Sequence, residues 1–296
     1  MDRLDAIAIF VAVAEARNFA AAAKKLARSP AAVTRAVAAL EASLGVRLLD
    51  RTTRSVRLTE VGGDYLLHAR RLLEDFHQAE QVAAGAQARP RGTLRVAAPL
   101  VFGRLHVLPV VADYLARHPG TDVQLALSDS VINLLEEGMD VAVRIGTLPD
   151  SSLIARRVGQ VRRVVCASRD YLATRGQPRR PADLAGHDAI VSSHTAGGDT
   201  WAFHRAGREI SVTVNPRLVV NGAEPAMDAA AAGLGVARVL SYQLKPRMTE
   251  GNLVSILDAW DDRVRPVSIV APAGRFMPAK VRAFIDLAAR ILPGRL

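Results

Sequence analysis

A change of sequence periodicity near residues 86–92 divides this chain into two parts that must fold differently. Before it, apolar residues recur at helical spacing, and after it short β-like runs alternate with helical runs. Gly85, Pro90 and Gly92 interrupt the pattern there, as is typical of a linker. At 296 residues the chain is also long enough for two domains. We therefore expect a small N-terminal part followed by a larger α/β part.

Basic charge is concentrated in the N-terminal part. The chain has a net charge of +10. Residues 17–57 carry a strong basic excess, residues 58–88 a mild acidic one, and the rest of the basic surplus is diffuse. A compact basic region joined to a mildly acidic helix is typical of a nucleic-acid-binding protein with a linker.

Composition and motifs argue against several other classes of protein. The single cysteine, Cys166, excludes an intramolecular disulfide and makes a cysteine-based zinc site improbable. The chain has no P-loop, GxGxxG, HExxH or G-x-S-x-G pattern, and its histidines are scattered. No apolar run approaches the length of a membrane helix, and the start lacks the order of a signal peptide. We expect a cytoplasmic protein with no cofactor, no metal, no membrane contact and no enzymatic activity.

Two short helices separated by a break form a candidate DNA-binding element. One helix is expected from Asn18 to Leu26, and the next begins at Ser29 and Pro30, which favour the N-cap and the first helical position. Gly45 then ends the second helix. Its expected buried stripe is Val33, Val37, Leu40 and Leu44, and its expected outer face is Ala31, Arg35 and Ala38.

The second helix of this pair has the features of a recognition helix. Small residues in its first turn allow close approach to the major groove, while an arginine and a threonine can reach base edges or phosphates. The candidate contacts are Ser29, Pro30, Ala31, Thr34 and Arg35. The alternative is an ordinary amphipathic helix with a solvated arginine.

The next segment, residues 48–58, predicts a β-hairpin with basic residues in and near its turn. Such a wing places Arg51 and Arg54 against DNA phosphates, with Thr53 adding a hydroxyl. The alternative is a solvated charged turn. Its position directly after the candidate recognition helix favours the DNA-binding interpretation.

A long helix is expected after Thr59, which is a good N-cap. Leu66, Ala69, Leu73 and Phe76 follow a spacing of three and four residues, which predicts a seam for dimerisation with a second copy. The alternative is that this helix packs on its own domain.

The C-terminal part has the pattern of a doubly wound α/β sheet. Residues 94–98, 123–127 and 140–145 are expected strands, separated by helical stretches ending near His118 and at Gly138. Pro109 either lies in the first turns of the first helix or kinks it. Further strands are expected at 164–167, 188–191, 217–220 and 267–270, and a final helix at 278–291.

Ligands of open α/β sheets bind at the carboxyl ends of the strands. The candidate effector-binding residues at these ends are Ala98, Pro99, Leu100, Ser128, Arg144, Ser168 and Asn221. Each could equally serve as a turn or cap residue. Because they are mostly small and neutral, they predict a small polar or carboxylate-bearing metabolite rather than a nucleotide.

Several of these segments together resemble one known family. Residues 29–41, 44–49, 51–54 and 58–62 look like the winged helix-turn-helix of the LysR-type transcriptional regulators. Residues 92–99, 127–130, 140–146, 181–184 and 233–235 resemble the effector domain of the same family. The resemblance covers nearly the whole chain. It departs at Ala20, where the family often has Ser or Thr, and at Arg169, where it often has Pro.

This resemblance implies an architecture and an assembly. The effector domain would have two lobes, as in periplasmic solute-binding proteins, with the chain crossing near 160–164 and 263–267. The helix after the wing would be a linker through which two copies dimerise, and further association to a tetramer is implied by the family alone.

The sequence thus predicts an α/β protein with a winged helix-turn-helix at 1–58, a linker helix at 59–88 and an effector domain at 89–296. Its expected function is sequence-specific, ligand-responsive transcriptional regulation, with double-stranded DNA, a small-molecule effector and a second copy as partners. Two alternative functions remain. An enzyme with a DNA-binding head lacks a visible catalytic motif, and a solute-binding protein would normally carry a secretory signal.

Overall fold

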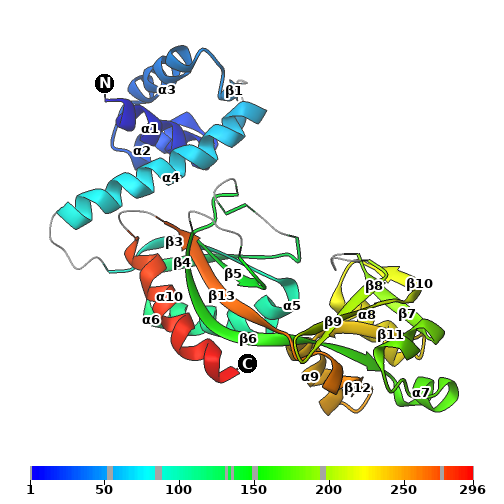
Figure 1. The fold of residues 1–296 in the computed structure, drawn as a ribbon. Helices are drawn as coiled ribbons and strands as arrows, with labels where there is room; N and C mark the ends of the chain where they lie inside the picture. The colour runs from blue at the N-terminus through cyan, green and yellow to red at the C-terminus, as the bar shows by residue number, and fades with distance from the viewer. Residues whose placement is uncertain are drawn as a thin grey trace. The chain divides into compact units, whose positions relative to one another are not determined.

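The computed structural model describes residues 2–51, 56–83, 89–130, 133–134, 137–148, 153–193, 198–273 and 277–295. The chain divides into two compact units, Met1–Arg89 and Pro90–Leu296. Figure 1 shows the elements of each unit. No helix within the described ranges is long and apolar enough to cross a membrane.

The first unit is a helical domain with a small hairpin. Its elements are α1 (Arg3–Ala16), α2 (Phe19–Lys25), α3 (Pro30–Leu44), β1 (Leu49–Arg51), β2 (Val56–Leu58) and α4 (Glu60–Ala83). The first three helices and the start of α4 enclose one hydrophobic core, in which Phe10, Val13, Val33 and Val37 are fully buried.

The helix ends lie where the capping residues predicted them. The Asn18 side chain accepts a hydrogen bond from the Ala21 amide at the start of α2, and the Ser29 hydroxyl accepts one from Ala32 at the start of α3. Gly45 ends α3 in the left-handed conformation, with φ of 71°. Thr59 caps α4 by accepting from the Gly62 amide.

The first helix is buried more widely than its periodicity predicts. The sequence pattern indicates one apolar face through Leu4, Ile7, Val11 and Ala14. In the structure Leu4 and Val11 are only half-buried, whereas Ile9, Phe10 and Val13 are fully buried. The reason is that α1 contacts α2, α3 and α4 at once, so no single stripe faces the core.

The predicted dimerisation seam of α4 is corrected by the structure in its first half. Leu66 and Ala69 are buried in the core of the first unit, and Leu73 packs against that core, because α4 lies along α1. These three side chains therefore cover their own domain. Phe76, one turn further on, is exposed, as is Leu72.

The second unit is built on one mixed sheet. Its described strands follow the order β10-β7-β11-β6-β13-β5-β3-β4, with β12 paired to β6. The strands are β3 (Gly92–Ala98), β4 (Thr121–Leu127), β5 (Val141–Ile145), β6 (Leu153–Ala167), β7 (Asp188–Ser192), β10 (Asn215–Val220), β11 (Val236–Leu240), β12 (Val254–Ile256) and β13 (Val264–Pro272). A separate hairpin pairs β8 (Thr200–Arg205) with β9 (Arg208–Thr213).

Two long strands, β6 and β13, connect two halves of this sheet. The early residues of β6 pair with β13, and its last residues pair with β11 and β12. Figure 1 shows β6 and β13 running side by side from one half to the other. We call the half with β3, β4 and β5 the first lobe and the half with β7, β10, β11 and β12 the second lobe.

Helices cover the sheet of the first lobe. They are α5 (Leu100–Phe102), a π-helical turn (Gly103–Val107), α6 (Leu108–Arg117) and α10 (Ala279–Ile291). Phe102, Tyr114 and Phe284 are fully buried against β3 and β13. Pro109 lies in the first turn of α6, where a proline is tolerated. The residue before it, Leu108, ends the π turn by donating its amide to the Gly103 carbonyl.

The second expected helix of this lobe, over residues 131–137, falls mostly on residues 131–132 and 135–136, which lie outside the described residues. Within the described residues, the Glu137 amide donates to the Asn133 carbonyl and the Met139 amide donates to the Leu134 carbonyl. Leu134 is buried in one cluster with Ala97, Ala142 and Val270 of the sheet.

The second lobe buries both faces of its sheet. Its helices are α7 (Arg169–Arg175), α8 (Ala223–Ala231) and α9 (Ser241–Thr249). Alternate strand residues pack either with Met227 and Leu244 of α8 and α9 or with Trp201 and Phe203 of the β8–β9 hairpin. Cys166 is fully buried in this sheet, and burial raises the pKa of its thiol to about 12, so the thiol stays protonated at neutral pH.

The sequence Gly233-Leu234-Gly235 serves chain packing in this lobe. Gly235 has a φ of 154°, and a Cβ atom there would overlap the carbonyl oxygen of Asp188 at the start of β7. Glycine at this position therefore lets β11 begin directly beside β7.

Candidate functional site

The outer face of α3 is a solvent-exposed surface of small and basic side chains. Ala31, Arg35 and Ala38 are exposed, as their positions on the helix predict. The Ser29 hydroxyl accepts from the Ala32 amide at 3.2 Å, and the Thr34 hydroxyl donates to the Pro30 carbonyl at 2.9 Å. Both hydroxyls keep further hydrogen-bonding capacity for a ligand.

The hairpin is fixed directly to α3. The Glu41 carboxylate accepts hydrogen bonds from the backbone amides of Leu48 and Leu49 at 2.9 and 3.0 Å, so the last half of α3 holds the start of β1. Strands β1 and β2 pair in antiparallel register, with Leu49 opposite Leu58. Thr53 and Arg54, and the side chain of Arg51, lie outside the described residues.

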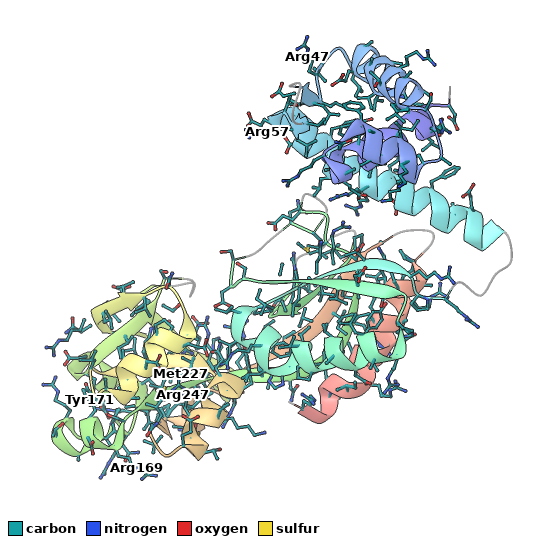
Figure 2. The ribbon with its side chains drawn as sticks, turned by 180° about the vertical axis from the view of Figure 1, so that it is seen from behind. Arg47, Arg57, Arg169, Tyr171, Met227 and Arg247 are labelled. Atoms are coloured by element: carbon teal, nitrogen blue, oxygen red, sulfur yellow. The ribbon has the colours of Figure 1, made fainter. Side chains whose placement is uncertain are left out.

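Two exposed arginines flank this hairpin and extend the basic surface. Arg47 precedes β1 and Arg57 lies on β2, and both project from the same side of the first unit in Figure 2. By contrast, Arg28 makes a double hydrogen bond with Asp5 at 2.8 Å, so its charge is neutralised within the unit. Arg47 and Arg57 belong to the basic excess of the sequence, and the structure shows both exposed beside the hairpin.

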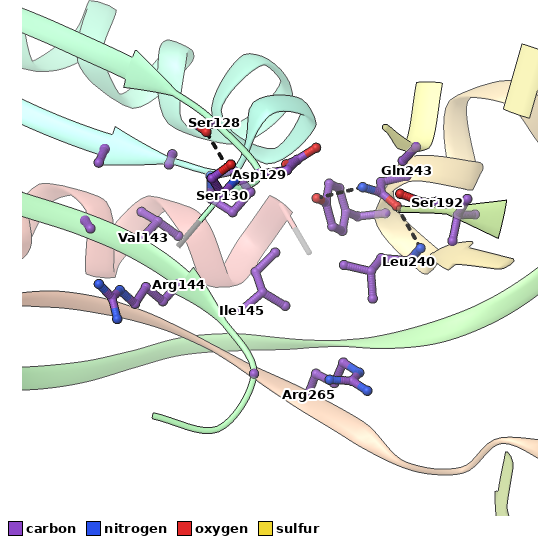
Figure 3. A pocket seen from close by; sticks show the side chains of 18 of the residues that line it. Ser128, Asp129, Ser130, Val143, Arg144, Ile145, Ser192, Leu240, Gln243 and Arg265 are labelled. Atoms are coloured by element: carbon purple, nitrogen blue, oxygen red, sulfur yellow. Dashed lines mark hydrogen bonds between the residues drawn. The ribbon is translucent and has the colours of Figure 1, made fainter. Parts of the chain in front are cut away.

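A cavity of about 460 Å³ lies in the second unit, at the carboxyl ends of several strands. This volume suits a small ligand. Of the residues predicted from the sequence, Ala98, Pro99, Ser128 and Arg144 line it. Figure 3 shows Ser128, Asp129 and Ser130 on one side of the pocket and Arg265 on the other.

Three predicted effector residues do not line this pocket. The Leu100 amide donates to Asp129 at 3.0 Å, but its side chain is exposed elsewhere. Ser168 is buried and caps α7, accepting from the Tyr171 amide. Asn221 is exposed after β10, the edge strand of the sheet.

The direction of β6 explains why Ser168 lies away from the pocket. Because β6 runs antiparallel to β11, its carboxyl end lies at the opposite sheet edge from the ends of β7 and β11. Ser192, Leu240 and Gln243 instead supply the wall from the second lobe. Arg169, where the chain departs from the family pattern, is the first residue of α7.

Sequence reasoning missed three further arginines that line the pocket: Arg163, Arg238 and Arg265. The side chain of Arg238 is 3% exposed, and its Nη2 donates to Asp261 at 2.6 Å and to the Ala202 carbonyl at 2.5 Å. Burial lowers the pKa of Arg238, and the Asp261 carboxylate opposes this shift. In the sequence, each of these arginines lies within a strand, and nothing marks it as facing a pocket.

Gln243, which lines the pocket from the second lobe, is fixed by two hydrogen bonds. Its side-chain oxygen accepts from the Leu240 amide at 2.8 Å, and its side-chain nitrogen donates to the Tyr242 hydroxyl at 3.2 Å. Burial raises the pKa of Tyr242, so this phenol stays neutral. In the part of the chain that the structure describes, no three His, Cys, Asp or Glu side chains gather as a metal site.

Comparison with known proteins decides the family. Residues 4–63 match the model of the bacterial regulatory helix-turn-helix proteins of the lysR family, and residues 87–292 match the LysR substrate binding domain. This chain belongs to the LysR-type transcriptional regulators. Its winged helix-turn-helix is therefore a DNA-binding domain, and its second unit is an effector-binding domain.

Relatives of this LysR-type regulator match over almost their whole length. A probable transcriptional regulator of Klebsiella pneumoniae, LtrA, is 30% identical, with 99% of this chain and 96% of LtrA covered. The structure of CrgA from Neisseria meningitidis has 31% identity and a TM-score of 0.62, covering 97% of this chain and 98% of CrgA. The full-length structure of the Vibrio cholerae virulence activator AphB has 27% identity and a TM-score of 0.62, covering 99% and 100%.

Proposed function

We propose that this LysR-type regulator reads its operator with the exposed face of α3 and responds to a small molecule in the pocket of its second unit. The observation that carries the first part is the face of α3 itself, where Ala31 and Ala38 leave room around the exposed Arg35. A helix with such a face fits the major groove, and an arginine there can pair with guanine.

Contacts to DNA divide into base reading and phosphate binding. Ser29, Pro30, Ala31, Thr34 and Arg35 form the proposed groove-facing surface. Arg51, Thr53 and Arg54 are proposed phosphate contacts of the wing, and we add the exposed Arg47 and Arg57 beside them.

Arg35→Ala is expected to weaken binding to the operator by roughly 1–3 kcal/mol while leaving binding to unrelated DNA nearly unchanged, because the lost contact is to a base. Fluorescence anisotropy with the intergenic DNA upstream of the gene measures both. Arg57→Ala is the matched comparison, since loss of a phosphate contact should weaken all sequences alike and reduce the salt slope by about one. Equal losses on both DNAs for Arg35→Ala would remove it from the base-reading set.

The effector pocket is proposed at Ala98, Pro99, Ser128 and Arg144 of the first lobe, closed by residues of the second lobe. Leu100, Ser168 and Asn221 are not part of it, because they do not line the cavity. Among the described residues that line the pocket, no run of glycine amides forms a phosphate cradle, which favours a small metabolite over a nucleotide.

Two copies are proposed to associate through the outward face of α4. Leu72 and Phe76 are one helical turn apart and are 48% and 42% exposed, which is costly for apolar side chains on a long helix. Dimerisation would present two α3 helices to two half-sites. We further propose that dimers associate into a tetramer, which the family resemblance alone implies.

Phe76→Glu should shift the assembly toward monomer in sedimentation velocity and weaken binding to a two-half-site operator. Leu67→Glu is the matched control, because Leu67 is similarly exposed, at 46%, but lies on another side of α4. An unchanged assembly in Phe76→Glu would place the interface elsewhere.

We also propose that the protein acts in the cytoplasm, where its DNA target lies, and that it has no catalytic activity. The support for the second point is chemical, since the described residues that line the pocket include no nucleophile paired with a general base.

A further inference from the structure

Three arginines come together on one face of the sheet where the two lobes join. They lie on three adjacent strands, with β6 between β11 and β13. Arg265 of β13 is paired with Val161, and Arg238 of β11 with Val165, so each lies diagonally across from Arg163 of β6. Diagonal neighbours on one face are within reach of long side chains.

The charges of this cluster are not balanced. Asp261 is the carboxylate that pairs with Arg238, at 2.6 Å. Arg163 and Arg265 are half-buried, and their side chains have no hydrogen-bond or ion-pair partner among the described residues; Asp261 acts on both charges without bonding to either. Burial and the neighbouring guanidiniums of Arg265 and Arg238 lower the pKa of Arg163 to about 10, so it is still charged at neutral pH.

Buried donors at the same place are also unsatisfied. The Nε and Nη1 atoms of Arg238 are buried without a hydrogen-bond partner in the described structure. Buried donors that lack a hydrogen-bond partner lower the stability of the folded state, and the repulsion between neighbouring like charges lowers it further. An anion beside Arg163 and Arg265 would relieve the repulsion within the cluster.

The rest of the pocket is suited to an apolar body. Val143 and Ile145 of β5 and Val239 and Leu240 of β11 line it beside Tyr242. Ser128 and Ser130 lie across from Arg265 (Figure 3). The lining also holds two carboxylates, Asp129 beside Ser128 and Ser130, and Glu137. The arginine end of the pocket is therefore strongly cationic and the middle is apolar, while the serine end offers hydroxyl groups and a carboxylate.

We propose that the effector is a small organic acid whose carboxylate lies between Arg163 and Arg265, with its hydrocarbon part against the apolar wall. This inference rests on the proposed effector pocket and gives its ligand class. The planar guanidinium forks match the geometry of a carboxylate. Because β6 and β13 are the strands that join the lobes, a carboxylate bound to both arginines ties the ligand to the connection between the lobes.

The test is thermal unfolding of the full-length chain with matched acids and amides. The probes are benzoate, phenylacetate, succinate and phthalate, each beside its neutral amide, with inorganic phosphate as an anion that has no apolar body. At least one acid is expected to raise the melting temperature more than its amide and more than phosphate. Acids no better than their amides, or phosphate as good as the best acid, would overturn the proposal.

Variants locate the anion in the pocket. Arg163→Gln and Arg265→Gln are each expected to weaken binding of the stabilising acid about tenfold or more by calorimetry. Arg162→Gln is the control, because it removes the same charge from the opposite face of β6 and should leave the affinity unchanged. Undiminished affinity in Arg163→Gln and Arg265→Gln would contradict the assignment.

A second measurement needs no ligand. If Arg163 and Arg265 are kept for an anion, the ligand-free double variant Arg163→Gln/Arg265→Gln should melt at or above the wild-type temperature, because like-charge repulsion is relieved. A clearly lower melting temperature would show that these arginines stabilise the fold instead. Operator binding is measured on the same samples, so a failure of the ligand class is distinguished from a failure of DNA binding.

Discussion

Asp261→Ala is expected to lower the free energy of unfolding of the second unit by about 3–5 kcal/mol. The Asp261 side chain is 9% exposed and pairs with Arg238, which is 3% exposed. Removing the carboxylate leaves a buried guanidinium without its counter-charge. The neighbouring Arg163 and Arg265 make this loss larger, since they add positive charge at the same place.

Urea unfolding followed by tryptophan fluorescence measures this change. Both tryptophans of the chain, Trp201 and Trp260, lie in the second unit, so their emission reports on that unit alone. Asp286→Ala is the matched control, because Asp286 pairs with Arg156 at a similar distance, 2.7 Å, but on the surface. The control should change stability by no more than about 0.5 kcal/mol. Similar losses in the two variants would mean that burial does not determine the strength of these pairs.

Gly62→Ala is expected to destabilise the first unit by about 3 kcal/mol and to abolish operator binding at concentrations that saturate the wild type. Gly62 is buried in the first turns of α4, where a Cβ atom would overlap the carbonyl oxygen of Leu48 and lie 2.8 Å from its carbonyl carbon. Leu48 is itself buried and begins the wing. Relief of the overlap must therefore move α4 or the wing, and neither is free to move without losing the Thr59–Leu48 hydrogen bond.

The neighbouring glycine gives the control. A Cβ atom at Gly63 would meet no heavy atom within 4 Å, and the residue is exposed. Gly63→Ala should therefore stabilise the helix by about 0.5–1 kcal/mol through its better helix propensity. Far-UV circular dichroism of residues 1–89 in urea compares the two variants. Equal effects at the two positions would contradict the contact between α4 and the wing.

The N-terminal unit was predictable because its signals are local. Asn18, Ser29, Gly45 and Thr59 determine helix ends through bonds to residues three or four positions away, and each lies where its type predicts. The inside and outside of α3 also follow from its own sequence. Burial of α1 on several sides did not, since it depends on three other helices.

The seam of α4 shows a limit of periodicity. The spacing of Leu66, Ala69 and Leu73 is the same whether the helix packs on its own domain or on a partner, and in the structure it packs on α1. Only the position of the neighbouring helix α1 distinguishes packing on the own domain from packing on a partner. The apolar spacing within α4 carries no information about that position.

Strand direction limited the prediction of the effector pocket in the same way. The ends of β3, β4 and β5 follow from the parallel order of the first lobe, so Ala98, Ser128 and Arg144 line the pocket. Ser168 does not, because β6 runs against β11. The cluster of Arg163, Arg238 and Arg265 joins residues up to about a hundred positions apart, and only the pairing of three strands brings it together.

Footprinting of the full-length protein on the DNA flanking its own gene tests the central claim most directly. The experiment is done without and with the organic acid that stabilises the protein most. The account predicts two protected half-sites separated by one or more helical turns, weaker protection by Arg35→Ala at the same protein concentration, and a change in protection or spacing on adding the acid. An absence of any protected site, or a footprint that the Arg35→Ala variant reproduces and the acid leaves unaltered, would contradict it.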